Sequence, residues 1–258
     1  MMRKILLAFN ALVYLFVLAP ILVVIPVSFS EKEYLVFPPQ GFTLRWYVNF
    51  FATRELADSL WLSLHLALWT TIISTVLGTM VALALVRYRY PGRQALREFF
   101  LTPIVMPRLV LGIAFLMFLS KTIFSGRFGG LLIAHVVVAF PYVIRTVCAS
   151  LVGFDRALEE AGASLGAAPL TVFRTITLPL LKPGIMAGAI FAYVTSFDEL
   201  VMTLFLAGPR LTTLPVQIFN YLEYTSDPTI AAISVVLIAI TTGAVLITER
   251  IVGFSQFV

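Results

Sequence analysis

Residues 159–179 read EEAGASLGAAPLTVFRTITLP, a polar stretch rich in small residues within a chain that is otherwise strongly apolar. Of the 258 residues, 60% are apolar and only 12% are charged. About 25% of the residues of an ordinary soluble domain are charged, so a water-soluble fold of this length would lack the polar surface to cover its apolar side chains. The composition therefore predicts a membrane protein, and residues 159–179 are its most conspicuous segment outside the lipid.

Around this segment, six charge-poor runs approach the ~20 residues that a helix needs to cross a bilayer. They predict an all-α membrane protein with six transmembrane helices in a single domain over residues 1–258. Arg108 interrupts the third run, and Asp198 with Glu199 interrupts the fifth. The first run is too long for a signal peptide and lacks a small-residue cleavage site, so it is predicted to be retained. The spans are expected at about 5–27, 59–86, 99–120, 129–148, 183–206 and 228–248.

The distribution of Lys and Arg predicts the orientation of the spans. With the N-terminus in the cytoplasm, eleven basic residues fall on the inner side, and six, among them Arg210, fall on the outer side. Both termini are then cytoplasmic, and residues 150–182 form the largest cytoplasmic loop. Because this bias accounts for the basic excess, no nucleic-acid partner is expected.

Few residues in the chain have the chemistry of a catalytic or metal site. The single cysteine, Cys148, excludes an internal disulfide and a zinc site built from paired cysteines. His65 and His135 lie in apolar runs, where a buried or helix-packing role is expected. The sequence has neither a G-x-x-x-x-G-K-[ST] phosphate loop nor a Ser/His/Asp set at one depth. We therefore expect a chain that is not an enzyme and binds no metal or cofactor.

The pattern of residues 153–169, GFDRALEEAGASLGAAP, predicts a short amphipathic helix. Asp155 is positioned to cap its N-terminus, and Pro169 prevents the helix from continuing. Leu158, Ala161 and Leu165 form one apolar stripe. A second short helix is expected to begin at Pro169 and to end before LPLLKP. Such a pair cannot bury its own stripe, so it lies either on the membrane surface or against a partner protein.

The spacing of Glu160-Ala161-Gly162, three residues, Gly166, nine residues and ITLP ending at Pro179 resembles the EAA motif of binding-protein-dependent ABC importer permeases. Gly162 stands where the motif commonly has a second alanine. The resemblance implies a type I ABC importer permease fold, with a coupling helix between the fourth and fifth spans that docks into a groove of a cytoplasmic ATPase. Its small residues would let the helix seat closely, Leu165 belongs to its apolar stripe, and Glu160 would pair with a basic group.

The same resemblance implies the partners of the chain. They are a cytoplasmic ATPase dimer that carries ATP and Mg, a second permease subunit, a periplasmic substrate-binding protein, and the lipid of a bacterial inner membrane. The second permease is expected to be a different chain, with two identical halves as the alternative. The stretches GFTLRWYVNF and LTPIVMP also match the family. Gly184, Gly188 and Ala192 recur every fourth residue at the start of the fifth span, which in this family borders the second permease, so close helix contact is expected there.

Asp198 and Glu199 lie about 22 Å along the fifth span at 1.5 Å per residue. A charge that faces lipid at this depth costs a few kcal/mol, so both should face protein or water. Neighbouring residues on a helix point about 100° apart, so one carboxylate is expected to face a pathway. Two interpretations stay open: a site for an amine beside Tyr193 and Phe197, or an ion pair with Arg108 of the third span.

SFDELVMTLFLAGP, TLPVQIF and SDPTIAAIS, in residues 196–234, resemble the second permease of spermidine and putrescine importers, which has an acidic pair at this place. The resemblance implies a polyamine substrate. Permeases for other small amines, opines, amino-acid-like compounds and phosphonates belong to the same branch and remain alternatives. A proton-driven secondary transporter that uses the carboxylates as a relay is a further alternative, as is a membrane scaffold without transport activity.

Overall fold

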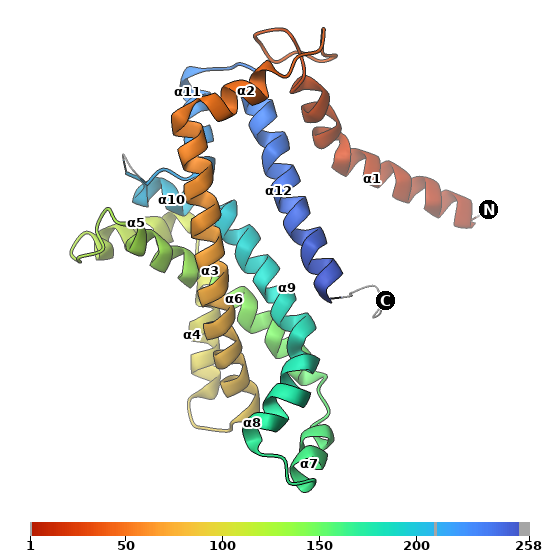
Figure 1. Ribbon diagram of the computed structural model, residues 1–258, viewed down its shortest axis with the longest axis vertical. Coiled ribbons are helices and arrows are strands. Elements are labelled where there is room, and N and C mark those ends of the chain that lie inside the picture. Colours follow the sequence, from red (N-terminus) through yellow and green to blue (C-terminus); the bar gives the residue numbers. More distant parts are fainter. Residues whose placement is uncertain (1, 209–210, 253–258) are drawn as a thin grey trace. The chain divides into compact units, whose positions relative to one another are not determined.

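The structure is a computed structural model that describes residues 2–208 and 211–252, and the described part consists of helices and connecting segments without strands (Figure 1). Arg210, one of the residues in the orientation count, lies outside the described part. The helices are α1 (Met2–Val27), α2 (Arg45–Ala52), α3 (Arg54–Arg87), α4 (Arg93–Val105), α5 (Arg108–Leu119), α6 (Phe128–Val152), α7 (Ala157–Ser164), α8 (Pro169–Val172), the π-helical turn η1 (Phe173–Thr177), α9 (Leu178–Phe197), α10 (Val201–Leu206), α11 (Leu214–Tyr224) and α12 (Thr229–Val252).

Five helical segments of the described part are long and apolar enough to cross a membrane, and the bent pair α4–α5 makes a sixth if it counts as one span. The five are α1, α3, α6, the continuous run from α8 to α9, and α12. The number agrees with the six predicted spans, but the helical run at the fifth covers Pro169–Phe197 in place of residues 183–206. In place of one straight helix over residues 99–120, however, α4 and α5 meet at 106°. Pro107 removes a backbone donor and forces Met106 into an extended conformation, with ψ 137°.

Tertiary contacts divide the chain into two compact units, with boundaries after residues 58, 216 and 243. Within the smaller unit, hydrogen bonds connect α2 to the loop after α1 and to the start of α12. Trp46 Nε1 donates to the carbonyl of Ser30 at 2.6 Å, and Asn49 Nδ2 donates to Thr229 Oγ1 at 3.0 Å. The single domain over residues 1–258 stays a prediction.

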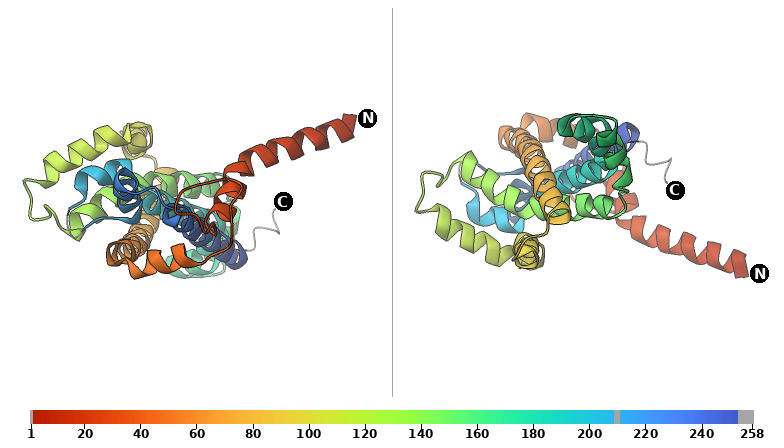
Figure 2. Two further views of the ribbon diagram at one scale, coloured as in Figure 1. Left: turned by 90° about the horizontal axis from the view of Figure 1, so that it is seen from above. Right: turned by 90° about the horizontal axis from the view of Figure 1, so that it is seen from below.

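The larger unit is built around the packing of α6 against α9, while α5 packs beside α10 (Figures 1 and 2). A Cβ atom at Gly188 would lie 2.6 Å from Thr146 Oγ1 and 2.9 Å from Val143 Cα, both on α6. A Cβ atom at Gly184 would also meet α6, and Ala192 is fully buried. The small-residue face of α9 therefore packs within this chain, and the expectation that it provides the contact with a second permease is wrong for these residues.

Replacing Gly188 by valine is expected to lower the melting temperature of the detergent-solubilised protein by several degrees. Overpacking costs about 1–3 kcal/mol, and each kcal/mol shifts the melting temperature by about 2–4 °C in a chain of roughly this size. Gly243→Val is the matched control, because a Cβ atom there has no neighbour within 4 Å. Equal melting temperatures for the two variants would contradict the packing argument.

The expected second short helix after Pro169 does not end before LPLLKP. Instead α8 continues through η1 into α9, which makes one helical run from Pro169 to Phe197. Pro179, at the start of α9, has no backbone donor for the carbonyl four residues earlier, and the chain adopts a π-helical turn directly before it. The N–H of Leu178 bonds to the carbonyl of Phe173, five residues back. The loop helix α7 is thereby followed, after residues 165–168, by one continuous helical run.

Candidate functional site

The helix α7 is capped by a side chain at its start and by a left-handed glycine at its end. Asp155 Oδ1 accepts the N–H of Ala157 at 3.0 Å, which agrees with the predicted capping role. At the other end Gly166 has φ +84°, and the N–H of Ala167 bonds to the carbonyl of Gly162 at 3.2 Å. This left-handed cap favours glycine. Gly166 therefore ends the helix, and its predicted role in close approach to a partner is not what its conformation indicates.

Gly162 also serves the internal packing of the loop. A Cβ atom at this position would lie 2.8 Å from Ile176 Cδ1 of η1. The small residue lets α7 lie close to η1 of the same chain, so the expectation that it opens a surface to a partner is wrong in this respect.

The apolar stripe of α7, on the side next to Gly162, is uncovered. Leu158 is 47% exposed and Leu165 is 90% exposed, although both are large apolar residues. Ala161 of the same stripe is also exposed, as are Glu160 on another side of α7 and Pro179 at the start of α9. An exposed apolar stripe of this kind is a typical interaction surface.

Glu159, the neighbour of Glu160, faces inward and connects three segments. Its Oε1 accepts hydrogen bonds from Arg87 at the end of α3 and from Thr177 of η1. The guanidinium of Arg87 also lies 5.9 Å from the ring centroid of Phe154, just before α7. Sequence reasoning missed this cluster, because Arg87 and Glu159 are 72 positions apart and no local pattern joins them.

Asp198 and Glu199 lie in a break between two helices and not on one continuous helix. The helix α9 ends at Phe197, Asp198 has φ −97° and ψ 7°, and α10 begins at Val201. Glu199 Oε1 accepts the N–H of Met202 at 2.9 Å, so this side chain caps α10. The expectation of two carboxylates about 100° apart on one helix is therefore wrong, since α9 ends at Phe197, before both of them.

The ion pair with Arg108 exists, and it involves Glu199 alone. Arg108 Nε lies 3.5 Å from Glu199 Oε2, and Glu199 is only 7% exposed. Arg108 Nη2 also lies 3.5 Å from the hydroxyl of Tyr142, and Nη1 has no hydrogen-bond partner among the described residues. Arg108 is the first residue of α5, at the bend after Pro107, and not in the middle of a straight span.

Asp198 is exposed, and its carboxylate forms no ion pair within residues 2–208 and 211–252. Tyr193 and Phe197 of α9 stack on one another, with ring centroids 5.6 Å apart and an interplanar angle of 12°. Phe197 is buried, whereas Tyr193 is partly exposed. The two carboxylates thus have separate environments: Glu199 belongs to a buried polar cluster, and Asp198 is free.

His135 of α6 contacts residues on both sides of the break between α9 and α10. Its Nδ1 lies 2.9 Å from Ser196 Oγ of α9, and its Nε2 lies 3.0 Å from Thr203 Oγ1 of α10. The expectation of a buried histidine is confirmed here, whereas His65 is exposed on α3. Sequence reasoning did not find the partners of His135, because a single histidine in an apolar run carries no signal for them.

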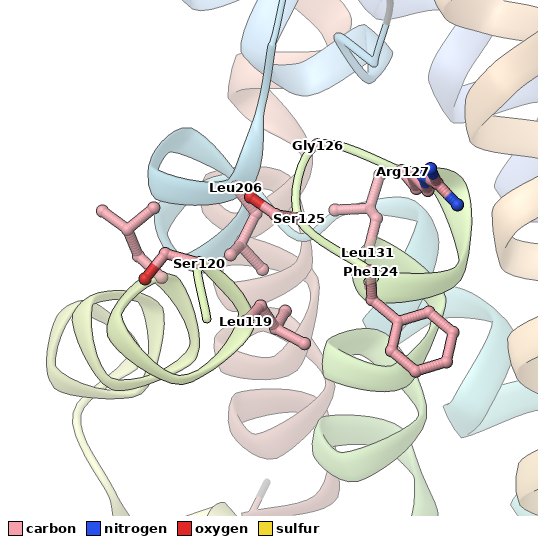
Figure 3. A pocket seen from close by; sticks show the side chains of 10 residues that line it. Leu119, Ser120, Phe124, Ser125, Gly126, Arg127, Leu131 and Leu206 are labelled. Atoms are coloured by element: carbon pink, nitrogen blue, oxygen red, sulfur yellow. The ribbon is translucent and has the colours of Figure 1, made fainter. Parts of the chain in front are cut away.

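Other hollows are lined by none of the residues of these clusters. One, of about 40 Å³, is at the turn between α5 and α6, where Leu119, Phe124, Leu131 and Leu206 line it with Arg127 (Figure 3). A water molecule needs only about 10–15 Å³ of such volume, so this hollow has room for water but not for a polyamine. It contains no predicted pathway residue.

The second hollow, of about 360 Å³, lies in the smaller unit and is lined by Trp46, Arg45 and Asp227, among others. Burial raises the pKa of the Tyr221 phenol, so this group stays protonated and donates to Asp227 Oδ2 at 3.0 Å. Arg45 Nη1 pairs with Glu33 at 3.5 Å. The charges lining this hollow are thus already partnered within the chain.

Known proteins resemble this chain over nearly its whole length. The spermidine/putrescine transport system permease protein PotC of Haemophilus influenzae is 30% identical over 244 residues, which cover 95% of this chain and 95% of that protein. The putrescine transport system permease protein PotI of Escherichia coli is 34% identical over 248 residues, which cover 93% of this chain and 85% of that protein.

The fold is also found among solved structures. A chain of the bacterial alginate ABC transporter in complex with alginate pentasaccharide-bound periplasmic protein matches with a TM-score of 0.75 and 14% identity, over 96% of this chain and 92% of that one. A family model described as binding-protein-dependent transport system inner membrane component matches residues 74–254. The chain therefore belongs to this family of multi-pass inner-membrane permeases of ABC importers.

Proposed function

We propose that this chain is a permease subunit of an ATP-driven importer for polyamines or a related small amine. It pairs with a second permease of different sequence, receives substrate from a periplasmic binding protein, and docks through α7 on a cytoplasmic ATPase dimer that carries ATP and Mg. The exposed stripe of α7 supports this proposal above all, because Leu165 is 90% exposed while Gly162, on the adjacent side of the helix, packs against η1. Both termini are then cytoplasmic.

In this arrangement, closure of the ATPase dimer on ATP moves α7, and α7 moves the helices to which it is attached. The exposed Leu158 and Leu165 bury apolar surface on the ATPase, while the exposed carboxylate of Glu160 pairs with a basic group. Hydrolysis reverses the movement and opens the permease pair toward the cytoplasm. The chain itself contributes no nucleotide chemistry.

The geometry of the break at residues 198–200 favours a cation as substrate. Asp198 is exposed at the C-terminal end of α9, where the helix dipole adds negative potential. The partly exposed ring of Tyr193 lies one turn earlier and attracts an ammonium group through its face. Arg108 does not repel the substrate strongly, because its charge is balanced by Glu199. The names of the PotC and PotI relatives support the same substrate class.

A zwitterionic or phosphonate substrate is the second candidate, and one observation favours it. Arg108 Nη1 is buried without a hydrogen-bond partner among the described residues, so it has a donor available for an anionic group. An amino-acid-like compound or an opine would then contact Asp198 through its amine and Arg108 through its carboxylate.

The proposal is tested with proteoliposomes that contain the permease pair and the ATPase, supplied with the binding protein. Spermidine or putrescine is expected to stimulate ATP hydrolysis and to accumulate inside only when ATP is present. A protonophore should leave this uptake unchanged. Uptake that collapses with the proton gradient and ignores ATP would instead support secondary transport, and stimulation by phosphonates or opines alone would overturn the polyamine assignment.

A further inference from the structure

One carboxylate of the coupling helix α7 accepts hydrogen bonds from residues at the ends of two other helical segments. Glu159 Oε1 accepts from Arg87, the last residue of α3, and from Thr177, the last residue of η1 before α9. The side chains of Arg87 and Glu159 are only 26% and 19% exposed. Because the pair is partly shielded from water, it is stronger than a surface ion pair.

The bond between Arg87 and Glu159 joins α7 to a long helix. The helix α3 is 34 residues long, or about 51 Å at 1.5 Å per residue. Its cytoplasmic end, at Arg87, is far in sequence from the loop at residues 150–182. Arg87 connects the two by its bond to Glu159 and by its position near the ring of Phe154, on the segment that leads into α7.

Glu159 is distinct from the surface that faces outward. Glu160, Leu158 and Leu165 are exposed, whereas Glu159 points back into the chain. Thr177 is fully buried, and Arg87, Glu159 and Thr177 lie together along one side of a surface hollow of about 330 Å³.

We propose that Arg87, Glu159 and Thr177 form a strap that transmits displacement of α7 to α3 and α9, and so sets the coupling between ATP hydrolysis and transport. This rests on the proposed function, since α7 must be moved by an ATPase for the strap to act. The three are positioning residues: none of them belongs to the outward-facing stripe of α7.

The strap is tested in proteoliposomes that contain the complete complex, with Arg87→Ala, Glu159→Ala, the double variant and Thr177→Val. Each single variant is expected to retain the ATPase, while the spermidine imported per ATP hydrolysed falls about tenfold, within the usual range of coupling between sites. If the two charges act as one link, the double variant is no worse than either single variant. Arg89→Ala is the matched control, because Arg89 is an exposed arginine in the loop directly after α3.

Variants that unfold would give no assembled complex, so Arg87→Lys and Glu159→Gln, which retain a hydrogen bond, are measured beside them. They are expected to give an intermediate import per ATP. The strap is refuted if all variants import as much per ATP as the unaltered chain, if Arg89→Ala loses as much, or if the losses of the single variants add. If the unaltered permease neither retains the ATPase nor responds to ATP, it is instead the proposed function that fails.

Discussion

Replacing Leu165 by aspartate is expected to detach the permease from its ATPase and to abolish ATP-dependent uptake. Leu165 is 90% exposed at the end of α7, against 47% for Leu158 of the same stripe. Buried apolar anchors of an interface contribute about 2 kcal/mol or more each, which corresponds to roughly 30-fold in affinity. An aspartate there would also be a buried, unpaired charge. The measurement is the amount of ATPase that co-purifies with the permease pair in detergent.

A matched control separates loss of docking from loss of folding. Val152 at the end of α6 is 80% exposed and lies outside the stripe of α7. Val152→Asp is therefore expected to leave the ATPase bound, and both variants should show the same melting temperature as the unaltered chain. If Leu165→Asp retains the ATPase and transports normally, α7 is not the docking helix.

The position and the amphipathic character of α7 could be predicted from the sequence, because both depend on residues close together in the chain. Asp155 and the stripe of Leu158 and Leu165 follow helix periodicity, and the structure has them in those roles. The roles of the glycines could not be predicted in the same way. Gly162 and Gly166 form a helical spacing of four, yet one faces η1 and the other ends the helix with a positive φ.

The two helix breaks differ in how much signal the sequence contains. Pro107 lies at the bend between α4 and α5. Because the residue before a proline is disfavoured in a helix, Pro107 predicts a break of the third span there. Residues 196–201, SFDELV, contain neither proline nor glycine, so the break after Phe197 has no local signal. It depends on tertiary partners: His135 bonds both sides of it, and Glu199 caps α10.

The pairing of the intramembrane charges also depends on tertiary structure that the sequence does not reveal. Hydropathy identifies Arg108, Asp198 and Glu199 as residues that need a partner or water, but it does not say which of them pair. The bend at Pro107 is what brings Arg108 within 3.5 Å of Glu199. Since a straight third span would have put Arg108 at a different depth, the pairing could be found only once the bend was known.

Neutralising the two neighbouring carboxylates separately is expected to give two different defects. Asp198 is exposed and unpaired, so Asp198→Asn should leave folding unchanged and remove a contact to the substrate. Loss of one partner of an exposed charged pair costs up to about 1 kcal/mol, which is roughly fivefold in the spermidine concentration that gives half-maximal uptake. Basal ATP hydrolysis and assembly should be unchanged.

Glu199→Gln is the matched variant at the next position, and it should fail by a different route. The amide oxygen can still cap α10, but Arg108 loses its ion pair and keeps a largely buried charge. Breaking a buried pair costs about 3–5 kcal/mol, so less folded protein and a lower melting temperature are expected. Changing Arg108→Gln as well should restore much of that stability, because no charge is then left unpaired. If instead Asp198→Asn unfolds the protein and Glu199→Gln alters only substrate affinity, the assignment of the two carboxylates is reversed, and Glu199 is the residue that contacts the substrate.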